Sequence, residues 1–243
     1  MRLRPFTTYF VLILATTLVV SISGQKPTRT VPPKAINQSK KAVDLIEQAM
    51  AKEARIPKAL LTRAVAVLVV TDMKTFGFLI EGAGKGSGVV TRRFADGKWS
   101  PGAYIFIRAA SIRPQFNADS FNVILLFMND KSADRLLDKT SVAFKRENAP
   151  VAGPVGEIRT EQKEVVPVAD VFSYVYDEGR LQSVDVKNLL QNVLITFDND
   201  LNKDTYGVTA ADILDELHGN KPTRVPDEVM GFTSAVARYC AAE

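Results

Sequence analysis

The chain has 243 residues, enough for one globular domain with terminal extensions, and its 46% hydrophobic and 24% charged residues are ordinary for a folded protein. One histidine and one cysteine make a catalytic triad or a transition-metal cluster hard to assemble, so we expect no enzyme, metal or cofactor. Residues 24–100 contain 14 Lys and Arg against 6 Asp and Glu, whereas residues 101–243 contain 15 against 21. A basic N-terminal half attracts anionic lipid headgroups or nucleic acid, unless it is only a solvated surface.

Residues 1–23 have the pattern of an export signal. Basic residues near the start precede an apolar stretch at 6–22, and Ser21 and Ser23 are small residues suited to a cleavage site. We therefore expect an extracytoplasmic protein, periplasmic or secreted. The alternative is an uncleaved membrane anchor, because the 17 residues of the apolar stretch are at the lower limit for a span.

Residues 24–34 contain three prolines and no apolar period, which predicts a linker. Ala35–Arg55 then has the pattern of an amphipathic helix, which Pro57 ends before a short helix at Lys58–Ala64. The apolar stripe of the first helix consists of Ala42, Val43, Ile46, Ala49 and Met50. We expect this stripe to pack on a sheet; the alternative is contact with a membrane.

Five apolar, β-branched segments with short connections predict an antiparallel sheet. They are Val65–Val70, Phe76–Glu81, Gly86–Phe94, Ala103–Ala109 and Phe121–Met128. Glycines alternate among them at Gly82, Gly84, Gly86 and Gly88, which removes the side chains from one face of an extended segment. We expect a bulge, a bend or the close approach of another element there. The glycine spacing matches neither a phosphate loop nor a dinucleotide fingerprint.

The second half of the chain alternates short elements. We predict a helix at Ser132–Asp138, a strand at Ser141–Lys145, a turn at Ala152–Gly156, a hairpin of Val171–Tyr176 and Leu181–Lys187, a helix at Ala210–Leu217 and a last helix after Pro226. These elements complete an α+β fold. We expect a twisted, mainly antiparallel β-sheet or partly closed barrel, packed with N- and C-terminal helices.

Three polar or reactive features in this half have structural explanations. Asp198–Asp204 begins like a calcium loop but lacks the required glycine and final glutamate, so we predict a polar turn. His218 stands where a helix ends, where a cation favours the helix dipole. Cys240 lies in an apolar helical pattern, which indicates a buried, inert thiol.

Several motifs occur in a fixed order along the chain. They are Ile56-Pro57-Lys58-Ala59-Leu60-Leu61, Gly86-Ser87-Gly88-Val89, Asp96-Gly97-Lys98-Trp99-Ser100-Pro101, Ala152-Gly153-Pro154-Val155-Gly156, Ser173-Tyr174, and Tyr206-Gly207 before Ile213-Leu214. Together they resemble the SYLF domain, a lipid-binding module found in bacteria, fungi, plants and animals. The resemblance covers roughly Ile36–Leu217. It implies a domain at 35–217 with a C-terminal helical extension at 218–243.

The resemblance and the charge distribution lead to one functional hypothesis, an exported, non-enzymatic module that binds anionic membrane surfaces. Charge clustering selects its candidate lipid contacts, which are Lys40, Lys41, Lys52, Lys58, Arg63, Lys85, Arg92, Arg93 and Lys98. Apolar insertion by the first helix would supplement them. We expect anionic phospholipid as the partner and no nucleic acid. An exported protein does not meet cytosolic actin, so the actin binding of some relatives is not carried over. The alternative is a structural or interaction protein of the cell envelope with an envelope protein partner.

Overall fold

The computed structural model describes residues 30–51, 55–76, 82–112, 120–137, 141–144, 149–156, 169–184, 190–191, 193–222 and 224–242. Its strands are β1 (Ala66–Phe76), β2 (Gly82–Arg92), β3 (Ala103–Ile112), β4 (Ser120–Phe127), β5 (Ser141–Phe144), β6 (Val151–Ala152), β7 (Val171–Asp177), β8 (Arg180–Ser183), β9 (Leu190–Gln191) and β10 (Val193–Phe197). Its helices are α1 (Pro33–Met50), α2 (Lys58–Leu61), α3 (Asp130–Asp134), α5 (Asn199–Tyr206), α6 (Ala210–Leu214), the 3-10 turn η3 (Asp227–Val229) and α7 (Gly231–Cys240).

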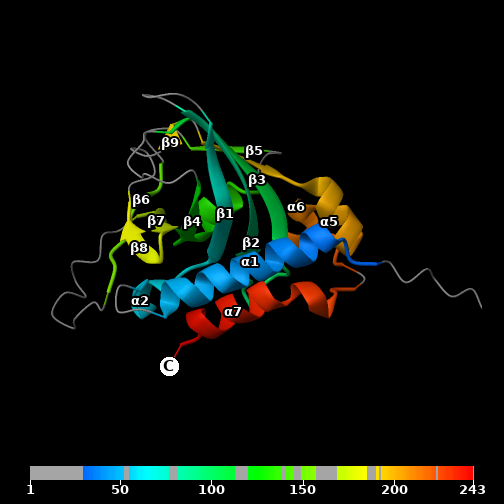
Figure 1. Cartoon of the computed structure of the whole chain (residues 1–243). Coiled ribbons are helices and arrows are strands. Elements are labelled where there is room, and N and C mark those ends of the chain that lie inside the picture. The colour runs from blue at the N-terminus through cyan, green and yellow to red at the C-terminus, as the bar shows by residue number, and fades with distance from the viewer. Residues whose placement is uncertain are drawn as a thin grey trace, which may run out of the picture.

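The described strands form one sheet in the order β5-β10-β3-β2-β1-β4-β7-β6, with β8 added to β7 and β9 to β3 (Figure 1). The β6–β7 pair is parallel and the other pairs are antiparallel. The predicted α+β class with a mainly antiparallel sheet is therefore confirmed. The path of pairings among the described strands is open, so of the two predicted forms the sheet is the one observed.

Strand β1 is longer than its predicted segment, because it continues through a bulge. Its register with β2 and with β4 shifts after Thr71 and Val70, respectively, and Asp72 in the bulge has a positive φ of 55°. Val65–Val70 is a strand as predicted, but Phe76 belongs to β1 and does not begin a strand of its own. The rest of the predicted strand Phe76–Glu81 lies outside the described residues.

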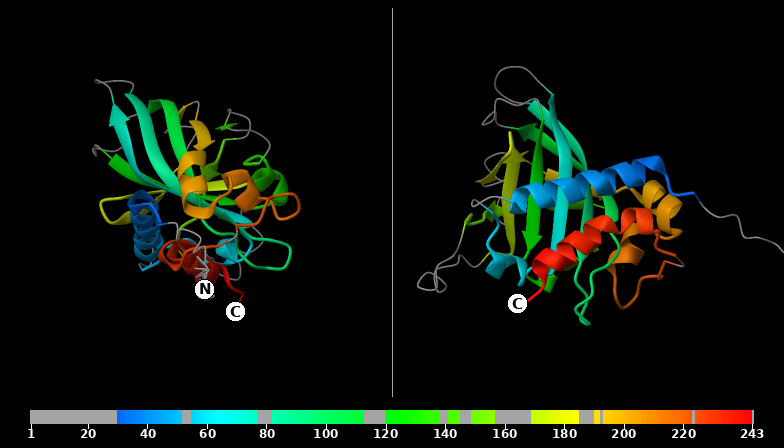
Figure 2. Two further views of the ribbon diagram at one scale, coloured as in Figure 1. Left: turned by 90° about the vertical axis from the view of Figure 1, so that its right-hand side faces the viewer. Right: turned by 60° about the horizontal axis from the view of Figure 1, so that its bottom comes forward.

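Helices α1 and α7 lie side by side across one side of the sheet (Figure 2). The apolar face of α1 is sealed there: Ala42, Ile46 and Ala49 are at most 3% exposed. Burial of one large apolar side chain stabilises a fold by about 1.5–3 kcal/mol, so this face is a core element. The expected packing on the sheet is confirmed for these three residues of the predicted stripe, while Val43 and Met50 are partly exposed. Insertion of the stripe into a membrane would have only these two partly exposed side chains to use.

The alternating glycines allow β2 to lie close to β1, and α1 also contacts this strand. The amide of Gln38 on α1 donates a hydrogen bond of 2.7 Å to the carbonyl of Gly88. A Cβ atom at Gly88 would lie 2.4 Å from the carbonyl oxygen of Val69, and one at Gly86 would lie 2.8 Å from Val70 Cγ1. Side chains at these positions would push the strands apart, so the prediction of a close approach holds.

The motif around Gly153 packs on the Ser-Tyr motif of β7. A Cβ atom at Gly153 would lie 2.2 Å from the hydroxyl of Tyr174, which donates a 3.0 Å hydrogen bond to the carbonyl of Pro154. Gly156, with φ of 85°, then turns the chain in a conformation that favours glycine. The two motifs therefore form one structural unit, although they are separated in the sequence. The predicted hairpin of Val171–Tyr176 and Leu181–Lys187 is present as β7 and β8, with β8 ending at Ser183.

The predicted turn at Asp198–Asp204 is wrong, because this segment forms helix α5. Asp198 caps the helix by accepting a 3.2 Å hydrogen bond from the backbone of Leu201, and Gly207 ends it with φ of 84°. The carboxylates that resemble a calcium loop therefore belong to a capped helix. Among the described residues, no group of histidine, cysteine and carboxylate side chains could hold a metal ion.

The C-terminal helices complete the core. Thr209 caps α6 as predicted, through a capping box with Asp212, but this helix ends at Leu214 and not at Leu217. His218 follows in a turn beside Asp215, 3.5 Å away. Helix α7 packs on α1, and burial raises the pKa of the Cys240 thiol to about 11, as expected for an inert cysteine.

Candidate functional site

A basic groove lies between the N-terminal half of α1 and strands β1, β2 and β3. Its volume is about 490 Å³, and Gly86 forms part of its lining. Its charged lining comprises Lys34 and Lys41 of α1, Asp72 and Lys74 of β1, Lys85 of β2 and Arg108 of β3. Neutral side chains, including those of Asn37, Gln38, Ser87 and Phe106, complete it. Among the described residues of the lining, five cations stand against one carboxylate, which suits the groove to an anionic ligand.

Three of these cations form a continuous row across the sheet, which we call the cationic row. In the antiparallel register Lys74 is paired with Lys85, and Lys85 is paired with Arg108. Paired residues project from the same side of a sheet with Cβ atoms about 4.5–5.5 Å apart, where like charges destabilise the pairing. The three side chains are exposed. The sheet therefore concentrates positive charge at a point where folding alone would disfavour it.

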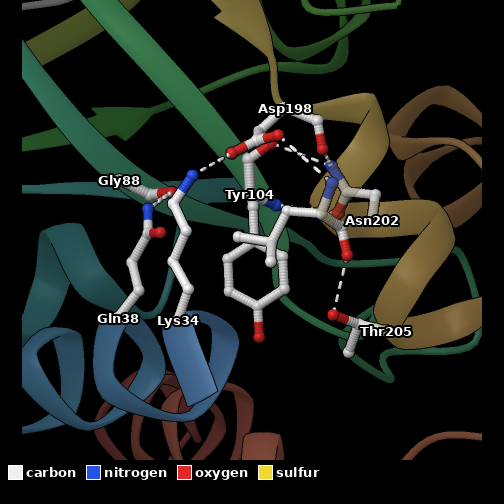
Figure 3. A network of polar contacts seen from close by, with 8 residues as sticks. Lys34, Gln38, Gly88, Tyr104, Asp198, Asn202 and Thr205 are labelled. Atoms are coloured by element: carbon white, nitrogen blue, oxygen red, sulfur yellow. Dashed lines mark hydrogen bonds and ion pairs between the residues drawn. The ribbon is translucent and has the colours of Figure 1, made fainter. Parts of the chain in front are cut away.

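The inner end of the groove is held by an ion pair. Lys34 Nζ lies 2.7 Å from a carboxylate oxygen of Asp198 (Figure 3). It also lies 4.8 Å from the centre of the Phe106 ring. The side chain of Asp198 is 8% exposed and that of Lys34 is 54% exposed. Lys34 is thus a partly solvated cation whose present partner is a nearly buried carboxylate, and it can reach solvent in the groove.

A buried polar network fixes the elements behind this ion pair. The amide of Asn202 on α5 and the backbone of Tyr104 on β3 exchange two 2.9 Å hydrogen bonds (Figure 3). The hydroxyl of Tyr104 in turn meets Ser39 of α1 at 2.9 Å. Burial raises the pKa of Tyr104, so its phenol stays protonated and acts as a hydrogen-bond partner. The network positions the start of α1 against the sheet and gives the groove a rigid back wall.

The predicted lipid contacts are dispersed, and two of them line the groove. These are Lys41, which is ion-paired with Asp72 of the bulge, and Lys85 of the cationic row. The exposed side chains of Lys40, Arg63 and Lys98 lie outside the groove lining. Lys52 lies outside the described residues.

Three other predicted contacts bind helices of the protein itself, and we call them the tethering cluster. Arg93 donates hydrogen bonds to the carbonyls of Thr62 and Cys240, at 2.8 and 3.1 Å. Its guanidinium also lies 4.8 Å from the centre of the Trp99 ring. Lys58 donates to a backbone carbonyl near the end of α7, and Arg92 pairs with a carboxylate of α3 at 2.7 Å. These contacts give the three cations a structural role.

Sequence reasoning missed Lys34, Lys74 and Arg108. None of them stands in a charge cluster or a motif, and Lys34 fell within the predicted linker. Lys74 and Arg108 become neighbours of Lys85 only through strand pairing. The cationic row could have been found only from a predicted register of the first three strands that included the bulge in β1.

Comparison with known proteins places the chain in a family. Residues 108–239 match the family model described as Ysc84, Las17-binding protein actin regulator. The match covers more than half of the 243 residues, so the chain belongs to the Ysc84 (SYLF) family, as the motifs indicated. No curated protein and no solved structure matches the chain. The matched span begins in β3 and ends one residue before the end of α7, whereas α1, β1 and β2 precede it. Within the described part of the chain, no helix is long and apolar enough to span a membrane.

Proposed function

We propose that this protein is an exported, non-enzymatic module that binds anionic lipids at a membrane surface through its basic groove. The cationic row carries the proposal, because strand register sets three like charges beside one another at the groove, where an anionic ligand would relieve their mutual repulsion. The family is associated with lipid binding and with actin-regulating interactions, which supports a binding role. The export pattern of residues 1–23 supports an extracytoplasmic location.

The proposed mechanism is electrostatic. A lysine or arginine near an anionic membrane contributes about 1 kcal/mol to binding, and salt screens this attraction. The apolar face of α1 is buried, so the groove has no apolar helix face to add to its charge. We therefore expect binding to depend on anionic lipid and to weaken strongly as the salt concentration rises.

Liposome co-flotation of the exported protein tests this. The wild type should float with anionic vesicles at low salt and remain unbound with neutral vesicles. A triple charge reversal, Lys74→Glu with Lys85→Glu and Arg108→Glu, should abolish flotation. The matched control reverses three exposed cations outside the groove, Arg63→Glu with Lys131→Glu and Lys203→Glu, and keeps the same net charge.

If both triple variants lose binding equally while remaining folded, the protein senses only net charge and the groove is not its site. Absence of wild-type binding to any vesicle would end the lipid proposal. The alternative is an interaction protein of the cell envelope, which the family description favours because it names a protein partner. That alternative predicts a retained envelope protein in pull-downs and no vesicle binding.

A further inference from the structure

We propose that the outer edge of strand β8 is a docking site for an extended peptide segment of a partner protein. The segment adds one strand to the sheet and carries an apolar residue followed by an acidic one. Strand β8 lies at the edge of the sheet, near the end of α1 (Figure 1). The site shares no described lining residue with the basic groove, so the inference is independent of lipid binding.

The first argument is the backbone of β8. Among the described strands its only neighbour is β7, which pairs with all four of its residues. The turn between the two strands consists of Glu178 and Gly179, with positive φ values of 45° and 76°, as in a type I′ hairpin. In such a hairpin the closing pair, here Asp177 and Arg180, is hydrogen-bonded, and the pairs then alternate. The N–H and C=O of Leu181 therefore point away from β7, toward the position of an added strand.

The second argument is a pocket beside this backbone, which we call the edge pocket. It lies between the end of α1 and the hairpin, has a volume of about 350 Å³, and is lined by Gln48, Ala49, Tyr176, Gly179, Arg180, Leu181 and Gln182. Tyr176 and Leu181 are paired across the hairpin, so their side chains project from the same side of the sheet. In an added strand the residue opposite Leu181 would project from this side as well and enter the edge pocket. Small-molecule sites span about 300–1,000 Å³, so this volume suits a single apolar side chain better than a larger ligand.

The third argument is charge complementarity, which selects the chemistry of the partner. Arg180 is exposed and is the only described lining residue of the edge pocket that is charged at neutral pH. Asp177 is its neighbour on β7, and no ion pair joins these two residues. Opposite charges paired across strands stabilise the pairing, so an added strand gains from an acidic residue opposite Arg180. A charge on an edge strand also discourages indiscriminate pairing, which restricts the site to segments that supply the matching acid.

The hairpin is held in place before any partner binds. Strand β7 is buried from Val171 to Tyr176 and pairs with β4 at each residue from Asn122 to Phe127. The side-chain amide of Asn122 also donates a 3.3 Å hydrogen bond to the carbonyl of Tyr176. An edge that is already fixed loses little conformational entropy when a strand is added, which favours binding.

The three arguments together define a probe. An antiparallel strand is slightly more stable than a parallel one, so the segment should run opposite to β8 and place its apolar residue before its acidic residue. The probe is the fluorescein-labelled heptapeptide Ser-Thr-Thr-Leu-Glu-Thr-Ser, in which leucine lies opposite Leu181 and glutamate opposite Arg180. Its binding to the protein is measured by fluorescence anisotropy. Absence of binding up to about 1 mM peptide would overturn the inference.

Two N-methylated forms of the probe test the backbone ladder. The N–H of the probe's leucine would donate to the carbonyl of Leu181, whereas the N–H of its glutamate would point away from β8. N-methylation at leucine should therefore weaken binding about tenfold or more, and N-methylation at glutamate should leave it nearly unchanged. Replacement of the leucine by serine tests the edge pocket and should also weaken binding about tenfold. Equal losses from the two N-methylations would overturn strand addition.

A charge exchange tests the choice of an acidic partner. Arg180→Glu should bind the probe about tenfold more weakly, and a probe with lysine in place of glutamate should restore its affinity. Lys203→Glu on α5 makes the same change in net charge at an exposed position outside the edge pocket and should bind like the wild type. Unchanged affinity in Arg180→Glu would overturn the acidic partner. A dimer of the protein in sedimentation that the probe does not dissociate would assign this edge to a second copy and would also overturn the inference.

Discussion

The cationic row and the tethering cluster lie toward opposite ends of the same strand, β2, and they use the same residue types for different purposes. Lys85 belongs to the row, whereas Arg92 ends the strand and Arg93 follows it. In the tethering cluster, protein carbonyls and carboxylates accept the hydrogen bonds of the cations. In the row, cations face cations across the sheet. The comparison teaches that position in the fold, and not residue type, decides the surroundings of a cation: distant helices surround those of the tethering cluster, whereas strand register sets those of the row beside one another.

The two clusters should also differ in the sign of their contribution to stability. Hydrogen bonds from a charged group to otherwise unpaired carbonyls stabilise a fold, by about 1.5–3 kcal/mol each. Like charges paired across strands cost stability. A protein that retains such a row loses stability at its proposed binding site, a common relation between stability and function. The following predictions test this contrast, from the largest effect to the smallest.

Strand β2 connects the two clusters, and Gly88→Ala should damage both by separating β2 from β1. The new Cβ would lie 2.4 Å from the carbonyl oxygen of Val69. This oxygen belongs to the backbone, so no side-chain rotation can relieve the clash. We expect a loss of about 3 kcal/mol or more in the free energy of unfolding, measured by urea denaturation. Gly97→Ala is the control, because no atom lies within 4 Å of its Cβ. Its positive φ of 82° should cost only about 1 kcal/mol. Equal losses in the two variants would contradict the close approach.

Arg93→Met should destabilise the protein without weakening anion binding. The substitution keeps much of the apolar stem but leaves the carbonyls of Thr62 and Cys240 without their donor. We expect a loss of about 2 kcal/mol in the free energy of unfolding. The folded variant should bind anionic vesicles nearly as well as the wild type. A large loss of vesicle binding at unchanged stability would show that Arg93 contacts the ligand and that the two clusters are not distinct.

Lys74→Gln should have the opposite effect on stability. Removing one charge from the row relieves repulsion from Lys85, and we expect a gain of up to about 1 kcal/mol in the free energy of unfolding at low salt. Added salt should shrink this gain because it screens the repulsion. Thermal unfolding at two salt concentrations measures both effects. A destabilised Lys74→Gln variant would mean that the row contributes to folding, and would remove the main reason to assign it to a ligand.

The smallest effect concerns the clamp between α1 and α7, in which Glu47 of α1 contacts Tyr239 and Arg238 of α7. The hydroxyl of Tyr239 donates a 2.6 Å hydrogen bond to Glu47, and Arg238 pairs with the same carboxylate. Tyr239 first, and Arg238 in addition, lower the pKa of Glu47 below its ordinary value of 4.5. A lowered pKa in the folded state means that this stabilisation is complete above that ordinary value and is lost as the pH falls through the folded pKa.

The clamp is largely exposed, so Glu47→Gln should cost less than about 1 kcal/mol at neutral pH. The difference in unfolding free energy between wild type and variant should shrink as the pH falls below 4.5, the ordinary value for this carboxyl. Chemical denaturation at a series of pH values measures it. A difference that stays constant down to strongly acidic pH would contradict the ionised clamp.

The sequence by itself determined most of the elements of this protein. Hydrophobic periodicity located the first helix and the core strands, since burial of one face imposes a period on the residues. Local chemistry identified the cap at Thr209 and the glycine strand beneath α1. Local chemistry was misleading at Asp198–Asp204, where the alternating carboxylates suggested a loop. Asp198 and Gly207 are also residues of the types that begin and end a helix, and the segment is helical. Overlapping local signals of this kind are settled by packing, here by the burial of Leu201 and Tyr206.

Only the tertiary structure decided which basic residues line the candidate site. The distribution of charge along the chain selected Arg93 and Lys58, but both side chains donate hydrogen bonds to backbone carbonyls of other helices. The distribution of charge along the chain did not indicate Lys74 or Arg108. These two residues become neighbours of Lys85 through strand register and a bulge at Asp72. Register depends on the pairing of whole strands, and a bulge changes which residues face each other. The sequence therefore determined the elements and the excess of positive charge. The pairing of those elements decided which basic residues line the groove.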